Sequence, residues 1–504
     1  MATPRPLDIN DVQGDILEGL GKKNQIFLFF RVKAGQASKF RDDLRSFIPL
    51  VTTTTQAKKF HQTIKDCKKQ AAEQGKPFPL IENSGVNVAF SKKGLVALGV
   101  TDNIGDPIFE NGMLADAGPT GLGDDLTAWD PNFKKDIHGV VTVTANSKIV
   151  LERTVDQIKR IFRVGRPDAT IEEVTRLVGQ VRPGAEDGHE HFGFNDGLSQ
   201  PAVQNVNAGV ISEPGETPVP QGVILLGREG DDGLVIPGST APPQKVTRPP
   251  WALDGSFLAF RYLKQLVPEF DAFLEAHPLD VGNVHIPGDP TGAELLGARL
   301  VGRWKSGAPV DLTPLRDNPA FATRQDFRFD QANQERCPFA AHIRKTNPRG
   351  DLGPGGTTIR RIIRRGIAFG PEVTEQEKRA KRSSDDPKLE RGLLFACYQS
   401  NLGNGFHFMQ QSWANNKTFP PEKNSVPLVS TPGIDPIIGV AAVGEPRSMV
   451  GASPDLSASN QTLDFSAKWV IPRGGEYFFS PSIPALKSKF ASPGRPGHPG
   501  HHEL

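Results

Sequence analysis

One acidic residue between two glycines is the first candidate for chemistry. Residues 191–201 read HFGFNDGLSQP, with Asp196 inside the run Gly-Phe-Asn-Asp-Gly. Paired glycines permit a tight backbone turn and close approach to a flat ligand. The apolar neighbours Phe192, Phe194 and Leu198 would disfavour the charged carboxylate, so Asp196 could exchange protons near working pH. The same residues also fit an ordinary Asp-Gly turn.

A histidine followed by several cations is the second candidate. Residues 337–349 read CPFAAHIRKTNPR, so His342 ends an apolar stretch and precedes Arg344, Lys345 and Arg349. An imidazole can ligate a haem iron, and nearby cations can pair with the two propionates. A structural histidine beside a solvated, charged turn would show the same pattern.

An arginine-rich segment is the third candidate. Residues 360–371 read RRIIRRGIAFGP, which predicts a strand that carries one buried guanidinium. A buried arginine requires an anionic partner. It can form a structural ion pair or stabilise a negatively charged oxygen species. Arg360, Arg361 and Arg364 are all open to that role.

The first half of the chain alternates strands and helices. Dense apolar runs predict buried strands, and apolar residues at helical spacing predict the helices between them. The predicted strands are 25–32, 85–91 and 139–145, and the predicted helices are 36–51, 92–98 and 149–164.

The second half repeats the pattern after a long irregular connection. Residues 205–250 are crowded with proline and glycine, as in a functional loop or linker. A strand at 255–262 and a helix at 267–276 then resemble the start of the chain, which predicts a duplicated α+β unit. Further predicted strands are 366–369, 393–398 and 476–479; a helix is predicted at 405–415, and residues 492–504 form a solvated tail.

Composition excludes several classes of function. The chain has 504 residues, and its 59 basic residues nearly cancel its 57 acidic ones, which disfavours nucleic acid or anionic lipid as a partner. No apolar run reaches the roughly 20 residues of a membrane helix. No secretory signal is recognisable at the start, so we expect an internal protein or a processed, extracellular one. Cys67, Cys337 and Cys397 have no metal-ligand spacing.

Five segments together resemble one protein family. GFNDG is similar to the Gly-x-x-Asp-Gly signature of the dye-decolorising peroxidases, AAHIRKTNPR to their proximal histidine segment, and RRGIAFGP to their distal arginine strand. GLLFACYQSNLGNGFHFMQQSWANN and RGGEYFFSPSI resemble C-terminal segments of the fungal members. The order also agrees, and the similarity begins at QGDILEGL near the start of the chain.

This resemblance implies an α+β fold. Two ferredoxin-like subdomains are expected, each with an antiparallel sheet and peripheral helices. Residues 1–208 would form the N-terminal domain that carries the acidic motif. Residues 209–504 would form the C-terminal domain and hold most of the haem.

The resemblance also implies roles for the three candidates. His342 would be the proximal iron ligand and Asp196 the distal acid–base group. Arg364 would stand beside Asp196, because the family's arginine lies six residues before the glycine of the motif. Arg360 and Arg361 are rivals for that role.

Further positions match residues around the cofactor. Arg344 corresponds to a propionate contact, while Leu393 and Phe395 correspond to apolar residues that line the peroxide side. An acidic partner is expected for the proximal histidine, because such a partner orients the imidazole and raises its basicity. Asp435 is the first candidate for that partner and Asp464 the second.

The implied activity is that of a haem peroxidase with one haem b per chain. Hydrogen peroxide would oxidise the enzyme, and bulky dyes, phenols and other aromatic substrates would reduce it by one-electron steps. Trp413 matches a family tryptophan proposed as a surface oxidation site, although a packing role fits equally well. A carboxylate base also predicts an acidic activity optimum.

Two other functions are compatible with the same residues. The first is a haem-binding or haem-handling protein with incidental peroxidase activity. The second is a protein without haem, in which Asp196 lies in a turn and His342 is structural. The sequence leaves open the natural substrate, the oxidation of manganese, and the choice between monomer and homodimer.

Overall fold

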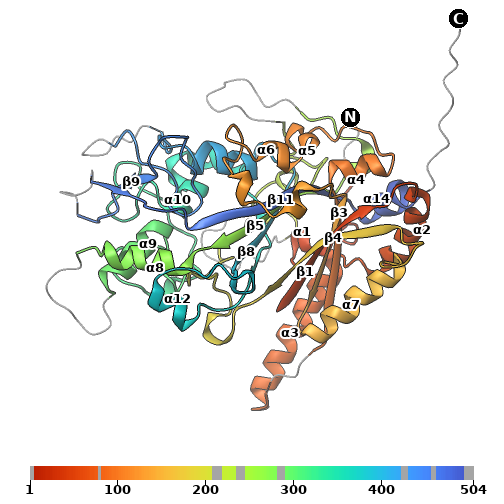
Figure 1. Cartoon of the computed structure of the whole chain (residues 1–504), viewed down its shortest axis with the longest axis horizontal. Helices are drawn as coiled ribbons and strands as arrows, with labels where there is room; N and C mark the ends of the chain where they lie inside the picture. The colour runs from red at the N-terminus through yellow and green to blue at the C-terminus, as the bar shows by residue number, and fades with distance from the viewer. Residues whose placement is uncertain are drawn as a thin grey trace, which may run out of the picture.

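Four antiparallel strands form the first half of the sheet in the computed structural model (Figure 1). The model describes residues 5–77, 81–206, 218–233, 245–280, 290–421, 429–455 and 461–492. The sheet order is β4-β1-β3-β2, so the first strand lies between the fourth and the third. The strands are β1 (Asn24–Val32), β2 (Ser84–Phe90), β3 (Gly139–Ala145) and β4 (Ile171–Gln180).

The second half repeats this order. Its strands follow each other as β11-β5-β8-β6, and β7 also pairs with β8. Numbered within each half, with β6 and β7 counted as one interrupted strand, both sheets therefore run fourth, first, third, second. This shared order confirms the predicted pair of ferredoxin-like units. The strands are β5 (Ser256–Gln265), β6 (Ile363–Arg364), β7 (Ile367–Phe369), β8 (Gly392–Gln399) and β11 (Val470–Ser480).

The two sheets meet along two seams and share one core. At the first seam Phe479 of β11 pairs with Phe90 of β2. At the second seam β4 packs against β7, where the backbone of Gly179 approaches Ile367. Between the seams Phe27 and Phe29 of β1 lie 4.8 and 5.0 Å from the ring of Phe260 in β5. An aromatic core therefore fills the space inside the curved sheet.

Helices cover the outside of the sheet in the first half (Figure 1). The helix α7 (Lys148–Ile161) begins where the side chain of Ser147 accepts a hydrogen bond from a backbone amide, and it buries Val150, Leu151, Val155 and Ile158. The longer α3 (Thr54–Glu73) begins with a complete capping box at Thr53. Its outer half is exposed.

The remaining elements are short and lie around both halves of the sheet. The helices are α1 (Gly14–Leu17), α2 (Ala37–Phe47), α4 (Lys92–Ala97), α5 (Pro107–Asn111), α6 (Met113–Asp116), α8 (Val267–Ala276), α9 (Gly292–Val301), α10 (His342–Thr346), α11 (Gly353–Thr358), α12 (Glu375–Ala380), α13 (Phe406–Phe408) and α14 (Ile483–Ala485), with π-helical turns at Met409–Ala414 and Leu486–Phe490. The strands β9 (Ser448–Val450) and β10 (Thr462–Asp464) form a separate pair.

Most predicted elements are found, but some predicted helices have other bounds and several observed elements were not predicted. The helix predicted at 36–51 ends at Phe47, just before a 3₁₀ turn that contains Pro49. The helix predicted at 405–415 is a short α-helix followed by a π-helical turn. The helix α3 and the strand β4 were not predicted. The proposed domain boundary after residue 208 and the tail beyond residue 492 lie outside the described residues. Among the residues described, no helix has the length and apolar character to cross a membrane.

The second seam provides a test of the fold. A Cβ atom at Gly179 would lie 2.3 Å from Cγ2 of Ile367 and 3.1 Å from the carbonyl oxygen of Ala368. Gly179→Ala should therefore lower the free energy of unfolding by about 1–3 kcal/mol, as overpacked sites do. Urea unfolding measures the change. Gly118→Ala is the control, because its Cβ would meet no atom within 4 Å. Equal stability of the two variants would contradict the close packing of β4 on β7.

Candidate active site

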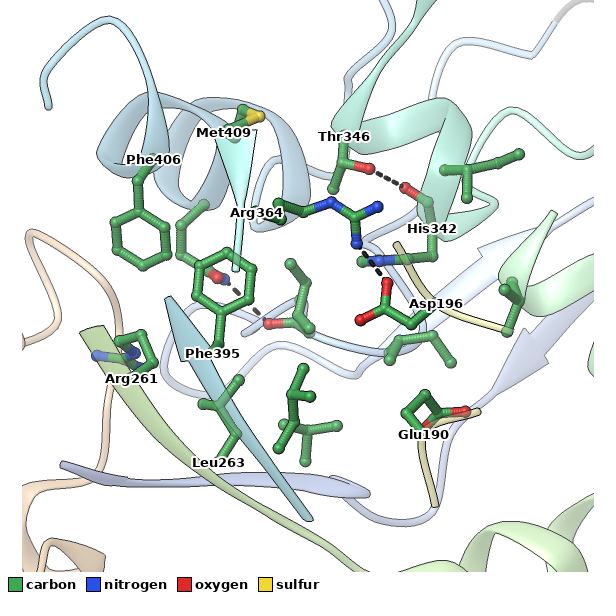
Figure 2. A pocket seen from close by; sticks show the side chains of 18 of the residues that line it. Glu190, Asp196, Arg261, Leu263, His342, Thr346, Arg364, Phe395, Phe406 and Met409 are labelled. Atoms are coloured by element: carbon green, nitrogen blue, oxygen red, sulfur yellow. Dashed lines mark hydrogen bonds and ion pairs between the residues drawn. The ribbon is translucent and has the colours of Figure 1, made fainter. Parts of the chain in front are cut away.

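A cavity of about 550 Å³ holds the three candidate groups (Figure 2). This volume suits a cofactor-sized ligand. Most of the wall comes from the second half of the chain, and the first half supplies residues of the loop at 190–199 and of the segment at 123–128. His342, Asp196 and Arg364 all line the cavity, as do both rivals, Arg360 and Arg361.

His342 presents its imidazole to the cavity from the first residue of α10. Its Nδ1 atom lies 2.8 Å from Oδ2 of Asp435, which is fully buried, while the imidazole remains 29% exposed. Burial lowers the pKa of His342, but the Asp435 carboxylate outweighs this effect and the net shift is upward. The second ring nitrogen is left for a ligand in the cavity. Asp464, the alternative partner, lies exposed in β10.

The Asp435 carboxylate is itself held rigidly. Its Oδ1 atom accepts hydrogen bonds from the backbone amides of Ile437 and Ile438, at 2.8 and 3.0 Å. Burial raises the pKa of Asp435. The charge of His342 and the hydrogen bonds from these amides lower it by more, so the net shift is downward. Arg447 fastens the same loop through the carbonyl oxygens of Pro436 and Gly439. A charged carboxylate therefore stands behind the imidazole.

Asp196 and Arg364 form an ion pair inside the cavity, as Figure 2 shows. Nη1 of Arg364 lies 2.5 Å from Oδ1 of Asp196, and the backbone amide of Gly197 donates to the same oxygen at 2.6 Å. The side chains are 30% and 35% exposed. No hydrogen bond reaches Oδ2 of Asp196 from the described residues, so this oxygen is available to a ligand.

The charge state of Asp196 differs from the prediction. Burial raises the pKa of Asp196, as its aromatic neighbours suggested. The charge of Arg364, the amide of Gly197 and the charge of His342 outweigh burial, and the pKa lies below its ordinary value. Asp196 is therefore a carboxylate at working pH rather than a neutral acid. Its apolar setting alone could not reveal this.

Apolar side chains form the wall beside the ion pair. Leu393 and Phe395 both line the cavity from β8, where the sequence placed them. Leu263 of β5 lines the wall on the neighbouring strand, and Phe406 and Met409 face the cavity from the segment after β8 (Figure 2). This surface could cover one face of a flat ligand and exclude water from it.

Arg303 and Arg349, like Arg447, lie in the wall and have only neutral partners among the described residues. Arg303 donates to the carbonyl oxygen of Gly307, and Arg349 to that of Gln325. Both guanidinium groups also donate to Oε1 of Gln325. Among the described residues neither forms an ion pair, and burial lowers the pKa of Arg303 to about 10 and that of Arg349 to about 9. Such cations favour a ligand with carboxylate groups, which is the chemistry of the haem propionates.

Arg344, the predicted propionate contact, lies outside this wall. Its side chain is fully buried and makes a two-point ion pair with Asp351 at 2.8 and 2.9 Å. Its other N–H groups donate to the carbonyl oxygens of Asp330, Asn333 and Cys337. No donor remains for a ligand, so the predicted contact is corrected to a structural ion pair. The local sequence could not show which carbonyl groups would surround the side chain.

Trp413 also differs from its predicted position. Its side chain is only 3% exposed, which excludes a surface site. The indole stacks on Phe419 at 5.1 Å and meets the edge of Phe408 at 5.4 Å. The alternative of a packing role therefore fits the structure better. The π-helical turn at Met409–Ala414 turns this side chain inward, a geometry that the sequence pattern did not reveal.

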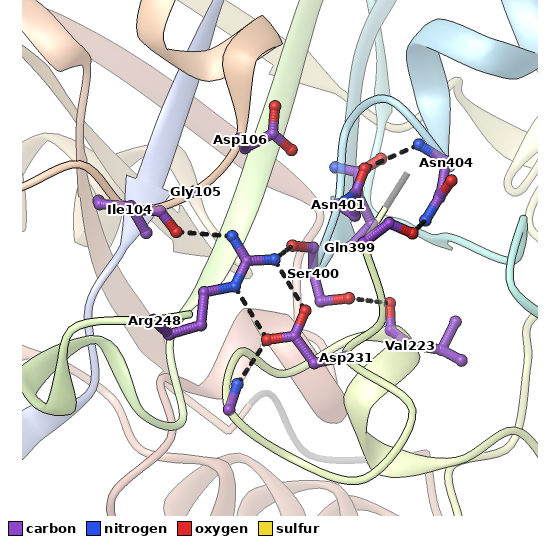
Figure 3. Close-up of polar contacts among 12 residues, drawn as sticks. Ile104, Gly105, Asp106, Val223, Asp231, Arg248, Gln399, Ser400, Asn401 and Asn404 are labelled. Atoms are coloured by element: carbon purple, nitrogen blue, oxygen red, sulfur yellow. Dashed lines mark hydrogen bonds and ion pairs between the residues drawn. The ribbon is translucent and has the colours of Figure 1, made fainter. Parts of the chain in front are cut away.

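A buried polar network that the sequence did not single out supports the end of β8 (Figure 3). Arg248 pairs with Asp231 at 2.7 Å and donates to the carbonyl oxygens of Ile104 and Ser400. It therefore joins the first half of the chain to the residues that follow β8. Asp106 adds a second link by accepting the backbone amide of Leu402 at 2.7 Å. This network fixes the segment that leads to Phe406 and Met409.

Family comparison agrees with this architecture. The protein-family model described as the DyP dimeric alpha+beta barrel domain matches residues 11–183. The model of the Dyp-type peroxidase C-terminal domain matches residues 246–420. The two matches fall on the two halves of the sheet.

Individual proteins give the same result over the whole chain. A dye-decolorizing peroxidase of Mycena epipterygia is 43% identical, covering 96% of this chain and 87% of its own length. The structure of an ancestral D-type dye decolorizing peroxidase is 49% identical with a TM-score of 0.84, and covers 97% of this chain and all of its own. A dye-decolorizing peroxidase in complex with 2,6-dimethoxyphenol is 40% identical with a TM-score of 0.79, at the same coverage.

The ion pair of Arg344 can be tested by removing its partner. Asp351→Ala leaves a buried guanidinium without its carboxylate and should lower the free energy of unfolding by about 3–5 kcal/mol. Chemical denaturation measures this loss. Asp385→Ala removes an exposed partner of Arg382, with 71% and 87% exposed side chains, and should cost less than about 1 kcal/mol. Weaker haem binding without a loss of stability in Asp351→Ala would instead restore the propionate contact.

Proposed function

Because the chain belongs to the dye-decolorising peroxidase family, we propose that it is a haem peroxidase that uses hydrogen peroxide to oxidise dyes and phenols. The family is haem-dependent, and substrates of this kind are electron donors that are oxidised in one-electron steps. The observation that supports the proposal most strongly is the cavity itself, because the imidazole of His342 and the ion pair of Asp196 and Arg364 line the same space.

His342 is assigned as the axial ligand of one haem b per chain. Asp435 accepts the Nδ1 hydrogen, which leaves Nε2 as the basic nitrogen for iron. Arg303 and Arg349 are assigned to the two propionates, since both are cationic and have neutral partners only. Leu393 and Phe395 are assigned to the wall on the peroxide side.

A haem bound here would supply the two electrons that reduction of hydrogen peroxide requires, which no side chain in the cavity provides. Asp196 acts as the acid–base group through Oδ2, because Oδ1 is already occupied by Arg364 and Gly197. The carboxylate takes a proton from one oxygen of hydrogen peroxide and returns it to the other, which leaves as water. Arg364 stabilises the negative charge that develops as the bond between the two oxygens breaks.

The cavity reaches the surface beside the first half of the chain. Asp125 is exposed and also lines the cavity, together with Ala128. We assign small phenols to entry through this opening. Bulky dyes are assigned to oxidation from outside the cavity, and the buried Trp413 is not available for direct contact with them.

The organisation of the whole chain follows from the same family. Residues 1–208 are proposed as the N-terminal domain and residues 209–504 as the C-terminal domain, with the cofactor held mainly by the latter. Either a monomer or a homodimer is compatible with this arrangement, since the proposed ligand, acid–base group and arginine all come from one chain.

An absorption spectrum is the direct test of this function. The purified protein, supplemented with haemin, should show a Soret band that changes at once on addition of one equivalent of hydrogen peroxide. Multiple turnovers with 2,6-dimethoxyphenol should follow. His342→Ala should lose the native band, whereas His277→Ala, which alters an exposed histidine, should retain it. A native band that peroxide leaves unchanged would favour a haem-handling protein instead.

The role of Asp196 predicts a specific pH dependence. The pKa of Asp196 is lowered, so the carboxylate form is present above that value and is lost only as the pH falls through it. The second-order rate with peroxide should therefore decline only at acid pH. Asp196→Asn should lower this rate by about 10²–10⁴-fold and remove the acid limb. Stopped-flow absorbance measures both. An unchanged rate and profile would show that another group moves the proton.

A further inference from the structure

The strand that carries Arg364 has an open outer edge. Strand β6 has two residues, and Arg364 is paired with Cys397 of β8. The next residue, Arg365, donates its backbone amide to Ala396 at 2.7 Å. Hydrogen bonds alternate in direction along an antiparallel strand. The amide and carbonyl of Arg364 therefore point away from β8, towards the loop that carries Asp196.

The side chain of Gln200 occupies this edge. Its Oε1 atom accepts the backbone amide of Arg364 at 2.9 Å, and its Nε2 atom donates to the carbonyl oxygen of Arg364 at 3.1 Å. One side-chain amide thus satisfies both groups, as a neighbouring strand would. No other described residue bonds to these two groups on the outer edge.

The same short segment also contacts the guanidinium group. Asp196 binds Nη1 of Arg364 at 2.5 Å, and the carbonyl oxygen of Ser199 lies 3.4 Å from Nη2. Residues 196–200 therefore contact Arg364 at its backbone and at the tip of its side chain. The two partners are far apart in the sequence, and they come from different halves of the chain.

We propose that Gln200 is a positioning residue that sets Arg364 at its working distance from Asp196. The inference rests on the proposed function of that pair. Gln200 touches neither the cofactor cavity nor a reacting atom, but acts through the backbone of Arg364. Its effect on the reaction would come from geometry, because small displacements of a charged group weaken its stabilisation of developing charge.

Other hydrogen bonds also hold the loop of residues 196–200. They determine which of the two groups, Asp196 or Arg364, would move if Gln200 were replaced. The backbone amide of Asp196 donates to Gly188 at 3.0 Å, and the side chain of Gln325 donates to the carbonyl oxygen of Leu198 at 3.1 Å. Lys22 holds the carbonyl oxygen of Arg365 at 2.7 Å from the opposite side. Asp196 would thus stay in place, while the backbone of Arg364 would lose its only contacts on the outer edge among the described residues.

Gln200→Leu removes both hydrogen bonds to the backbone of Arg364 while it keeps a side chain of similar size. The matched control is Gln221→Leu, since Gln221 also bonds to a backbone carbonyl, that of Gln204, and lies outside the cavity wall. Hydrogen–deuterium exchange of the haem-loaded proteins, followed by mass spectrometry, should show faster exchange in the peptide that contains Arg364 for Gln200→Leu alone. This measurement needs no peroxide and is independent of the proposed activity.

The second readout is the reaction with peroxide. Gln200→Leu should lower the second-order rate with hydrogen peroxide about tenfold or more, while the KM for 2,6-dimethoxyphenol stays unchanged. The acid limb of the rate should move to higher pH, because Arg364 is the charge that lowers the pKa of Asp196 most. The other charged groups that act on Asp196 are His342, Lys22 and Glu190, and they are unaltered.

Gln200→Glu provides a graded variant. It keeps an acceptor for the amide of Arg364 and loses the donor to its carbonyl oxygen, so its exchange and rate should lie between wild type and Gln200→Leu. It also carries the test if Gln200→Leu does not fold.

Two results would overturn the proposal. Unchanged exchange at Arg364 would show that Gln200 does not hold the strand. Faster exchange with an unchanged peroxide rate and acid limb would show that the contact is structural only. A wild-type protein that exchanges as expected but ignores peroxide would refute the proposed function instead, and the role of Gln200 with it.

Discussion

Charge that enters a protein interior needs a partner, and the arginines of this chain show how that need shapes the molecule. Arg344 and Arg391 lie in two-point contacts with buried carboxylates. Arg299 is fully buried and donates to six backbone carbonyl oxygens. Arg303 and Arg349 also have only neutral partners among the described residues, but unlike Arg299 they line a cavity. The imbalance at that wall is what an anionic cofactor would relieve.

The fold was predictable where burial follows the chain's periodicity. The strand at 139–145 and the helix at 267–276 were predicted at their observed bounds, because their apolar residues are dense or regularly spaced. Strand β4 was missed because it reads IEEVTRLVGQ and lies at an edge, where charged side chains are tolerated. Helix α3 was missed because most of its surface is exposed and carries only a weak apolar stripe. Such elements depend on tertiary position rather than on local pattern.

The candidate site was also predictable only in part. The motifs singled out His342, Asp196 and Arg364, and all three line one cavity in the structure. Their roles stay predictions. The choice of Asp435 over Asp464 agrees with its contact to the imidazole. What sequence could not supply is the surroundings of each group: the carbonyl oxygens around Arg344, the inward turn of Trp413, or the charge that keeps the carboxyl group of the acidic motif ionised. Gln200 stands inside the motif HFGFNDGLSQP, yet only its amide contacts single it out.

Strand β11 has a consequence for how the molecule is made. The first sheet has all four of its strands once residue 180 has been synthesised, and it can form while the ribosome is still at work. The second sheet lacks one of the two neighbours of β5 until residues 470–480 emerge. That late strand also supplies Val470 and Ile471 to the cavity wall. A cofactor that depends on this part of the wall would therefore bind only after strand β11 has been made and has joined the sheet.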